Sequence, residues 1–271
     1  MTEKKKIAAI ISEYRPGSHA DVIIGKYLQG FPTDDGLCAP RVELASMYID
    51  LFPDNDMSRA MSAQFGVPIY TSMPGALCLG GAELAVDGVL LIGEHGDYAW
   101  NEKDQQLFPR RYFMEQICGV MGKSGRGAPI FNDKHLSYSW TDAKWMYDRA
   151  KEVGAAFMAG SSLPVSWRNP WVEHELEAPI EEALAIGFSG LDIYGFHTLE
   201  VLQCMVERRE GGETGVKAVT CLEGDAVWAA AEEGLWSREL AEAACAEIEE
   251  SMRAMICGMR RGDTTSQRAL C

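Results

Sequence analysis

The sequence has little positive charge, no long apolar run and no paired-cysteine motif. Its 271 residues carry 25 Lys and Arg against 40 Asp and Glu, a formal net charge of -15. A surface this acidic repels nucleic acid and anionic membranes, so neither is an expected partner. No apolar run approaches the roughly 20 residues that span a bilayer. The run IAAII after MTEKKK is too short for the apolar core of a signal peptide, so we expect a cytoplasmic protein.

The eight cysteines are scattered, and no two of them form a CxxC pair. Zinc-ribbon spacing is therefore absent, and Cys118 and Cys204 lie inside apolar stretches. Cysteines in such positions are typical of reduced thiols packed as small hydrophobic side chains. The cysteine pattern predicts neither a disulfide framework nor a zinc ribbon.

Apolar runs of strand length alternate with helically spaced segments through the first 160 or so residues. This alternation predicts an α/β fold with a Rossmann-like, mostly parallel sheet. From Ile180 the pattern changes to an extended segment at 183–190, a helix at 198–209 and a strand at 215–222. We expect a Rossmann-like domain at 1–136. Residues 137–271 should continue the sheet and add a short α+β portion for substrate binding or oligomerisation.

One strand organises the expected site. Val89 to Ile92 is an unbroken apolar run, the pattern of a strand buried on both faces, and it ends in Gly93, Glu94, His95, Gly96 and Asp97. The next strand ends in Asp133, Lys134 and His135, and His197 follows the later extended segment. Because parallel strands share one carboxyl edge, where open α/β sheets bind ligands, we expect these side chains to converge.

Histidine and carboxylate side chains at one edge suit a divalent metal or a general acid and base pair. The predicted ligands of a Zn, Mn or Fe ion are Glu94, His95, Asp133, His135 and His197. The predicted catalytic residues are Lys134, His197, His95 and Glu94. For each histidine alone, the alternative is a helix cap or a hydrogen bond to a loop carbonyl.

Further residues predict cofactor and substrate binding. Arginine holds a carboxylate or phosphate bidentately, although Arg110 and Arg111 could equally pair with the excess acid. Asp50 closes the second expected strand, where a dinucleotide fold places its ribose acid, and a plain loop acid is the alternative. The predicted cofactor-binding residues are Tyr14, Arg15, Ser18 and Asp50. The predicted substrate-binding residues are His19, Asp97, Tyr98, Arg110, Arg111 and Tyr194.

Three stretches resemble the Gfo/Idh/MocA oxidoreductases. VDGVLLI at 86–92 is similar to that family's fourth strand, and Asp133, Lys134 and His135 match its Glu-Lys-Pro-like motif. DIYGFHTLEVL at 192–202 resembles its motif of a histidine, a couple of residues and an acid. The resemblance covers residues 5–220 loosely. It implies a Rossmann fold, NAD(P), a sugar or polyol substrate, a homo-oligomer, and Lys134 and His197 as catalytic residues.

The sequence also departs from that family. ISEYRPGSHAD has no GxGxxG, and Tyr14 and Arg15 lie where glycines let a pyrophosphate approach the backbone. The fourth strand ends in EHGDY rather than in a small turn that contains proline, and Ile193 stands where the family has an aspartate.

We therefore expect an enzyme that acts on a small polar, hydroxylated substrate, with an anionic or a sugar-like molecule as the two candidate kinds. The expected chemistry is metal-assisted or His/Lys acid–base catalysis, of the lyase, isomerase or hydrolase type. The first alternative is an NAD(P)-dependent oxidoreductase of the Gfo/Idh/MocA type. The second is a non-catalytic ligand-binding or partner subunit that keeps the fold.

Overall fold

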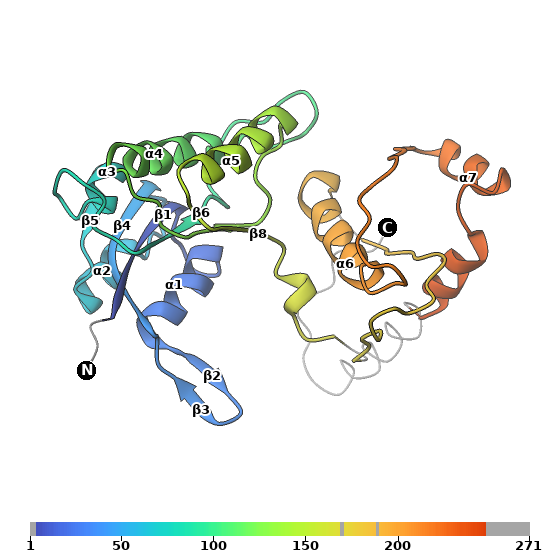
Figure 1. Ribbon diagram of the computed structural model, residues 1–271, viewed down its shortest axis with the longest axis horizontal. Coiled ribbons are helices and arrows are strands. Elements are labelled where there is room, and N and C mark those ends of the chain that lie inside the picture. Colours follow the sequence, from blue (N-terminus) through green and yellow to red (C-terminus); the bar gives the residue numbers. More distant parts are fainter. Residues whose placement is uncertain (1–3, 169–170, 188–189, 248–271) are drawn as a thin grey trace. The chain divides into compact units, whose positions relative to one another are not determined.

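The computed structural model describes residues 4–168, 171–187 and 190–247 (Figure 1). The chain divides into two compact units, residues 1–162 and 163–271, each described here by itself. In the described ranges, no helix combines the length and the apolar character that crossing a membrane requires.

The first unit is built on a six-stranded sheet with the order β5-β4-β1-β6-β7-β8. Every neighbouring pair in it is parallel. Its strands, in chain order, are β1 (Lys5–Glu13), β4 (Val42–Leu51), β5 (Ile69–Tyr70), β6 (Gly88–Ile92), β7 (Ile130–Asp133) and β8 (Phe157–Gly160). Numbered along the sheet, this is the 3-2-1-4-5-6 order of doubly wound dinucleotide folds. The predicted α/β, Rossmann-like class is confirmed.

Both faces of the central strands are covered, which explains their unbroken apolar runs. Val89 and Leu91 of β6 belong to a core with α3, α4 and α5 on one face, whereas Leu90 and Ile92 belong to a core with α1 and α2 on the other. The helices of this unit are α1 (His19–Gln29), α2 (Ser58–Phe65), α3 (Met73–Leu77), α4 (Arg110–Lys123) and α5 (Trp140–Glu152). Successive residues of one strand thus alternate between two buried layers.

Two local features complete this unit. The turn-rich stretch at 31–41 contains an antiparallel hairpin of β2 (Phe31–Thr33) and β3 (Gly36–Cys38). The helix α3 is short, because Leu79 and Gly80 after it take positive φ angles of 50° and 81° that end it.

The described part of the second unit is helical and irregular. Its elements are η1 (Leu163–Val165), the π-helical turn η2 (Leu191–Gly195), α6 (Phe196–Val206) and α7 (Asp225–Glu232), followed by a helical stretch at 238–247. The strand expected at 215–222 does not form: Val216 and Val219 are 70% and 85% exposed, so no sheet or core covers them. In the described residues of 183–190 there is likewise no strand.

Candidate functional site

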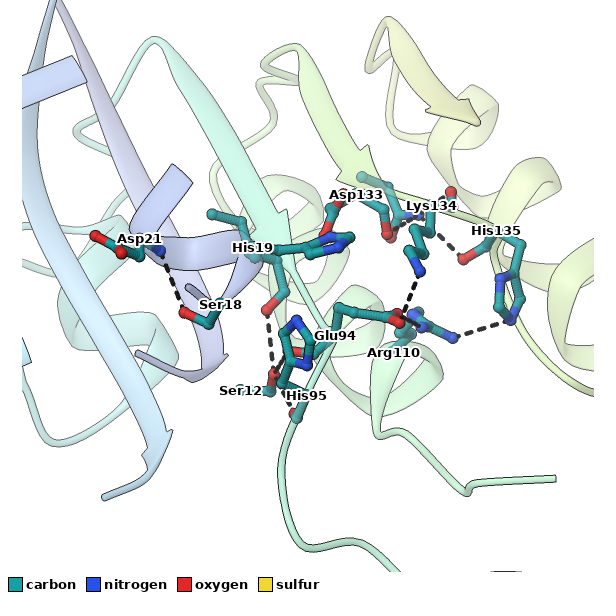
Figure 2. Close-up of polar contacts among 12 residues, drawn as sticks. Ser12, Ser18, His19, Asp21, Glu94, His95, Arg110, Asp133, Lys134 and His135 are labelled. Atoms are coloured by element: carbon teal, nitrogen blue, oxygen red, sulfur yellow. Dashed lines mark hydrogen bonds and ion pairs between the residues drawn. The ribbon is translucent and has the colours of Figure 1, made fainter. Parts of the chain in front are cut away.

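The connections that leave β1, β6 and β7 meet at the carboxyl edge of the sheet (Figure 2). β1 and β6 are strands 1 and 4 of the 3-2-1-4-5-6 order, so the edge between them is the topological switch point. Open α/β sheets bind their ligands in the crevice at this point.

Glu94 lies between two buried cations. Its Oε1 is 2.9 Å from Nζ of Lys134, and its Oε2 accepts a hydrogen bond from Nη2 of Arg110. The side chains of Arg110, Glu94 and Lys134 are only 1%, 7% and 8% exposed. Gly93 makes this possible, because a Cβ at its position would lie 2.7 Å from Cγ of Arg110. The glycine directly after β6 therefore leaves room for the arginine stem.

Together, these three buried side chains carry one formal positive charge in a site shielded from water. Burial opposes ionisation of Glu94, but Arg110 and Lys134 outweigh it and lower the pKa of this carboxyl below its ordinary value of 4.5. Glu94 is thus an anion at neutral pH, and two cations face it. We call Glu94, Arg110 and Lys134 the buried triad.

Two residues of the site hold a left-handed backbone. His95 has φ 68° and Lys134 has φ 71°, a conformation that costs a residue with a side chain about 1–3 kcal/mol. Ser12 holds the first of these turns, since its buried hydroxyl lies 2.7 Å from the carbonyl oxygen of Glu94 and 2.8 Å from that of His95. The Asn132 amide holds the second, donating to the carbonyl oxygen of Lys134 at 3.0 Å.

His19 and His95 form a second cluster beside the triad. Nδ1 of His19 is 2.6 Å from Oδ2 of Asp133. The rings of His19 and His95 meet edge to face with centroids 5.0 Å apart. Arg15, which also pairs with Glu13, lies 3.4 Å from Nδ1 of His95 through Nη2. The two histidines thus link the β1, β6 and β7 connections.

His95 is a neutral imidazole at physiological pH. Burial, followed by the neighbouring charge of His19, lowers the pKa of His95 from 6.5 to about 4. Because the Arg15 guanidinium only donates, the contact at Nδ1 assigns the imidazole proton to Nε2. That nitrogen is buried and has no hydrogen-bond partner among the residues the structure describes. It is a buried donor whose hydrogen-bonding capacity is unsatisfied within the described part of the chain.

Asp50, at the end of β4, accepts two phenolic hydrogen bonds. The Tyr48 hydroxyl donates to Oδ1 at 2.8 Å, and the Tyr98 hydroxyl donates to Oδ2 at 2.9 Å. Tyr48 precedes it on the same strand, whereas Tyr98 comes from the connection that follows β6. The chain itself thus supplies two hydroxyl donors to the carboxylate predicted to bind ribose.

Other predicted residues lie elsewhere. Tyr14 is fully buried in the core that α1 covers. Asp97 is exposed to solvent. Arg111 stacks on Trp145 with its guanidinium 3.1 Å from the ring centroid. Ser18 caps α1, accepting a hydrogen bond from the Asp21 amide.

Tyr194 and His197 belong to the second unit, where their ring centroids are 6.3 Å apart. The expectation that His197 follows a strand is wrong, because it lies in the first turn of α6 directly after η2. His135 belongs to the edge in the first unit, where Nη1 of Arg110 lies 3.2 Å from its Nε2.

The sequence reasoning did not assign roles to Ser12, Asn132, Tyr48 or Glu13. Ser12, Asn132 and Glu13 share a signal, a polar residue at the end of an apolar strand, but their hydrogen-bond partners lie on other connections or in the following turn. In the sequence, Tyr48 has the place of an apolar strand residue. Its polar role, a hydrogen bond from its hydroxyl, depends on Asp50 two residues later.

The predicted metal centre does not form. No group of three His, Cys, Asp or Glu side chains in the described ranges is arranged to hold a metal ion. The reason is that these candidate ligands are bonded to neighbouring basic side chains: Glu94 to Lys134 and Arg110, Asp133 to His19, and His135 to Arg110. A carboxylate or imidazole lone pair that accepts such a bond is not offered to a metal.

No family model and no curated protein sequence matches the chain. Among solved structures it is similar to an NAD-binding protein from Listeria innocua and to myo-inositol 2-dehydrogenase from Lactobacillus plantarum, at 16% and 13% identity. It is also similar to GenD2 of gentamicin A biosynthesis in complex with NAD, at 20% identity. The TM-scores are 0.37, 0.38 and 0.36, and each alignment covers 58% of this chain and 35–36% of the other.

This chain therefore matches about a third of the length of those proteins. By their names they are NAD-binding proteins and dehydrogenases, the class that the sequence resemblance indicated. The main functional prediction, a metal-assisted or acid–base lyase, isomerase or hydrolase, is wrong. The residues that the structure describes provide no group of metal ligands for such chemistry.

Proposed function

We propose that the protein is an NAD(P)-linked oxidoreductase that acts on the hydroxyl or carbonyl group of a small polar molecule. The observation that carries this proposal is the buried triad at the switch point of the sheet. Oxidation of an alcohol develops negative charge on its oxygen as the proton leaves. Two buried cations against one carboxylate provide a preorganised, net positive environment for that oxygen.

Lys134 is the residue of the triad that can hold or move the proton. It directly follows β7, and its ammonium contacts the Glu94 carboxylate at 2.9 Å, whereas an arginine does not deprotonate in proteins. In the Gfo/Idh/MocA resemblance, Lys134 also matches the catalytic lysine. Its left-handed backbone, held by Asn132, fixes the direction in which the ammonium points.

His95 complements Lys134 as an orienting donor. Its neutral ring offers the Nε2 proton without adding charge to the edge. A donor of this kind positions the substrate oxygen or a carboxamide without competing for the proton. His197, in the second unit, stays a predicted catalytic residue.

The residues present suit a dinucleotide in part. Asp50 has the acceptor chemistry that a ribose diol needs, because it already accepts from two hydroxyl groups. The Arg15 guanidinium offers a phosphate contact in the β1–α1 connection, in place of the glycine-rich backbone. The Asp21 carboxylate accepts from the Gly17 amide and works against a phosphate there. When bound, the dinucleotide supplies the hydride acceptor or donor.

The first test is nicotinamide binding, read from the fluorescence of the seven tryptophans during titration with NADH and with NADPH. The proposal expects micromolar affinity for one of them. The absorbance of reduced nicotinamide, measured with a panel of polyols, sugars and hydroxy acids, then reports turnover. If neither nucleotide binds below millimolar concentration, the proposal is wrong.

The second test uses Lys134→Met with Lys144→Met as its matched control. Lys144 lies on the exposed face of α5, where it forms an ion pair with Asp148. Lys134→Met should keep nucleotide affinity within about threefold and lower turnover about 100-fold or more, the usual contribution of a proton-transfer group. Binding without turnover in the wild type would instead favour the non-catalytic alternative.

A further inference from the structure

We propose that Tyr98 occupies the place of a ribose hydroxyl on Asp50, so that a nucleotide binds this edge only when Tyr98 is displaced. The inference rests on the proposed function and names the chain's own competitor for the cofactor. Its basis is the 2.9 Å hydrogen bond from the Tyr98 hydroxyl to Oδ2 of Asp50. The carboxylate at the end of the second strand is the group that receives ribose hydroxyls in dinucleotide folds.

Gly96 leaves the space that the Tyr98 ring occupies. Gly96 has φ 127°, and a Cβ there would lie 2.4 Å from Cε2 of Tyr98 and 3.0 Å from Cδ1 of Leu51. On its other side, the ring meets Phe108 edge to face, with centroids 5.8 Å apart. The backbone after β6 is thus shaped to lay this ring against the end of β4, beside Asp50.

Hydrogen bonds within the segment that carries Tyr98 stabilise its shape. We call residues 97–108 the Tyr98 segment. The Asn101 side chain accepts from the amides of Lys103 and Gln105, and the Leu107 amide donates to the carbonyl oxygen of Ala99 at 2.8 Å. A segment with this internal bonding can leave Asp50 as a unit without breaking the strand pairing of the sheet.

The competition does not depend on protonation in the physiological range. Burial, followed by the hydrogen bond to Asp50, raises the pKa of the Tyr98 phenol. The same two causes, in the same order, raise the pKa of the Tyr48 phenol. Both hydroxyls therefore remain donors at neutral pH. What frees Asp50 is movement of the Tyr98 segment, since Tyr48 is fixed within β4.

The test measures NADH and NADPH affinity by calorimetry for the wild type, Tyr98→Phe and Tyr147→Phe. Tyr147→Phe is the matched control, because it removes a phenol from the exposed face of α5. Tyr98→Phe removes a hydrogen bond to a charged acceptor, so NADH affinity should rise about tenfold. The control should bind as the wild type does. Asp50→Asn added to Tyr98→Phe should cancel the gain.

Hydrogen exchange of the wild type provides a second readout that needs no variant. On saturation with NADH, the amides next to Tyr98 that the internal bonds of the segment do not protect should exchange faster, because the segment leaves Asp50. Equal or weaker binding by Tyr98→Phe, or slower exchange of the segment with NADH, overturns the inference and leaves the proposed function standing. If no variant binds NADH or NADPH, both are wrong.

Discussion

Nδ1 of His19 lies 2.6 Å from Oδ2 of Asp133, although His19 begins α1 and Asp133 ends β7. The contact crosses the end of β6, which lies between β1 and β7 in the sheet. His95, from the connection that leaves β6, stacks edge to face on the same His19 ring. Three strand ends are therefore joined by side chains, and this makes the switch point a preorganised site.

Asp133→Asn should change the tautomer of His19. The aspartate holds a proton on Nδ1 and leaves Nε2 as the basic nitrogen of the neutral ring, whereas a neutral amide holds that proton less strongly. Two-dimensional nitrogen–proton NMR of the imidazoles measures the two forms directly. Asp148→Asn, which alters an exposed ion pair on α5, is the control and should leave the His19 spectrum unchanged. An unchanged His19 spectrum in Asp133→Asn would show that the contact does not set the tautomer.

Glu94→Gln should destabilise the protein more than any exposed carboxylate change. It leaves the buried Arg110 and Lys134 without their anion, which typically costs about 3–5 kcal/mol. Chemical denaturation measures the loss. Glu115→Gln removes the partner of Arg111 in an exposed pair, and it should cost less than about 0.5 kcal/mol.

The cost of Glu94→Gln should also depend on pH. The pKa of Glu94 is lowered in the folded state, so its stabilisation is fully present above the ordinary value of 4.5 and is lost as the pH falls through the lowered pKa. The difference in unfolding free energy between wild type and Glu94→Gln should therefore shrink in acid. A difference that stays constant as the pH falls well below 4.5 would contradict the assigned role of the triad.

The sequence predicts the sheet and the edge, but not the bonding within the edge. Unbroken apolar runs such as Val89 to Ile92 are buried on both faces, and parallel strands must end together, so the convergence of Glu94, Asp133 and Lys134 could be expected. Which partner each of these side chains bonds to depends on the left-handed turns at His95 and Lys134. The His95 turn is stabilised by the long-range bonds of Ser12, and the Lys134 turn by the Asn132 amide two residues earlier, and the apolar strand pattern encodes neither.

The same limit explains the other errors. An apolar stretch such as 215–222 is compatible with a strand only if a partner covers it, and the sequence pattern does not reveal the partner. A carboxylate beside a histidine predicts a metal only if both keep their lone pairs. Arg110 belongs to a helix and not to a strand end. Its guanidinium contacts both Glu94 and His135. The metal prediction did not account for that arginine.

His95→Asn should change how stability responds to mild acid. Asparagine tolerates the left-handed backbone at this position, so the substitution removes the titrating group without adding strain. With a folded pKa of about 4 against an ordinary 6.5, wild-type His95 binds fewer protons folded than unfolded in this window. Its contribution is complete above pH 6.5 and falls as the pH drops toward 4. Unfolding free energies from pH 8 to 5 should decline more steeply for wild type than for His95→Asn. Parallel curves would contradict the assignment of His95.

Comparison of Ser12→Ala with Ser46→Ala separates an effect on stability from an effect on the geometry of the site. Both serine hydroxyls are fully buried and donate to a backbone carbonyl, Ser12 to Glu94 at 2.7 Å and Ser46 to Ala76 at 2.8 Å. Each substitution leaves a buried carbonyl with one bond fewer, at a cost of about 1–3 kcal/mol.

Only Ser12 holds the turn in which His95 is left-handed, so Ser12→Ala alone should release His95 and Glu94 from their fixed directions. We expect similar losses of unfolding free energy in the two variants, but weaker NADH binding only in Ser12→Ala. The pKa of His95, followed by NMR, should move back toward 6.5 in Ser12→Ala and stay near 4 in Ser46→Ala. If both variants change His95 equally, the effect follows from general loosening of the first unit, and Ser12 has no special hold on the turn.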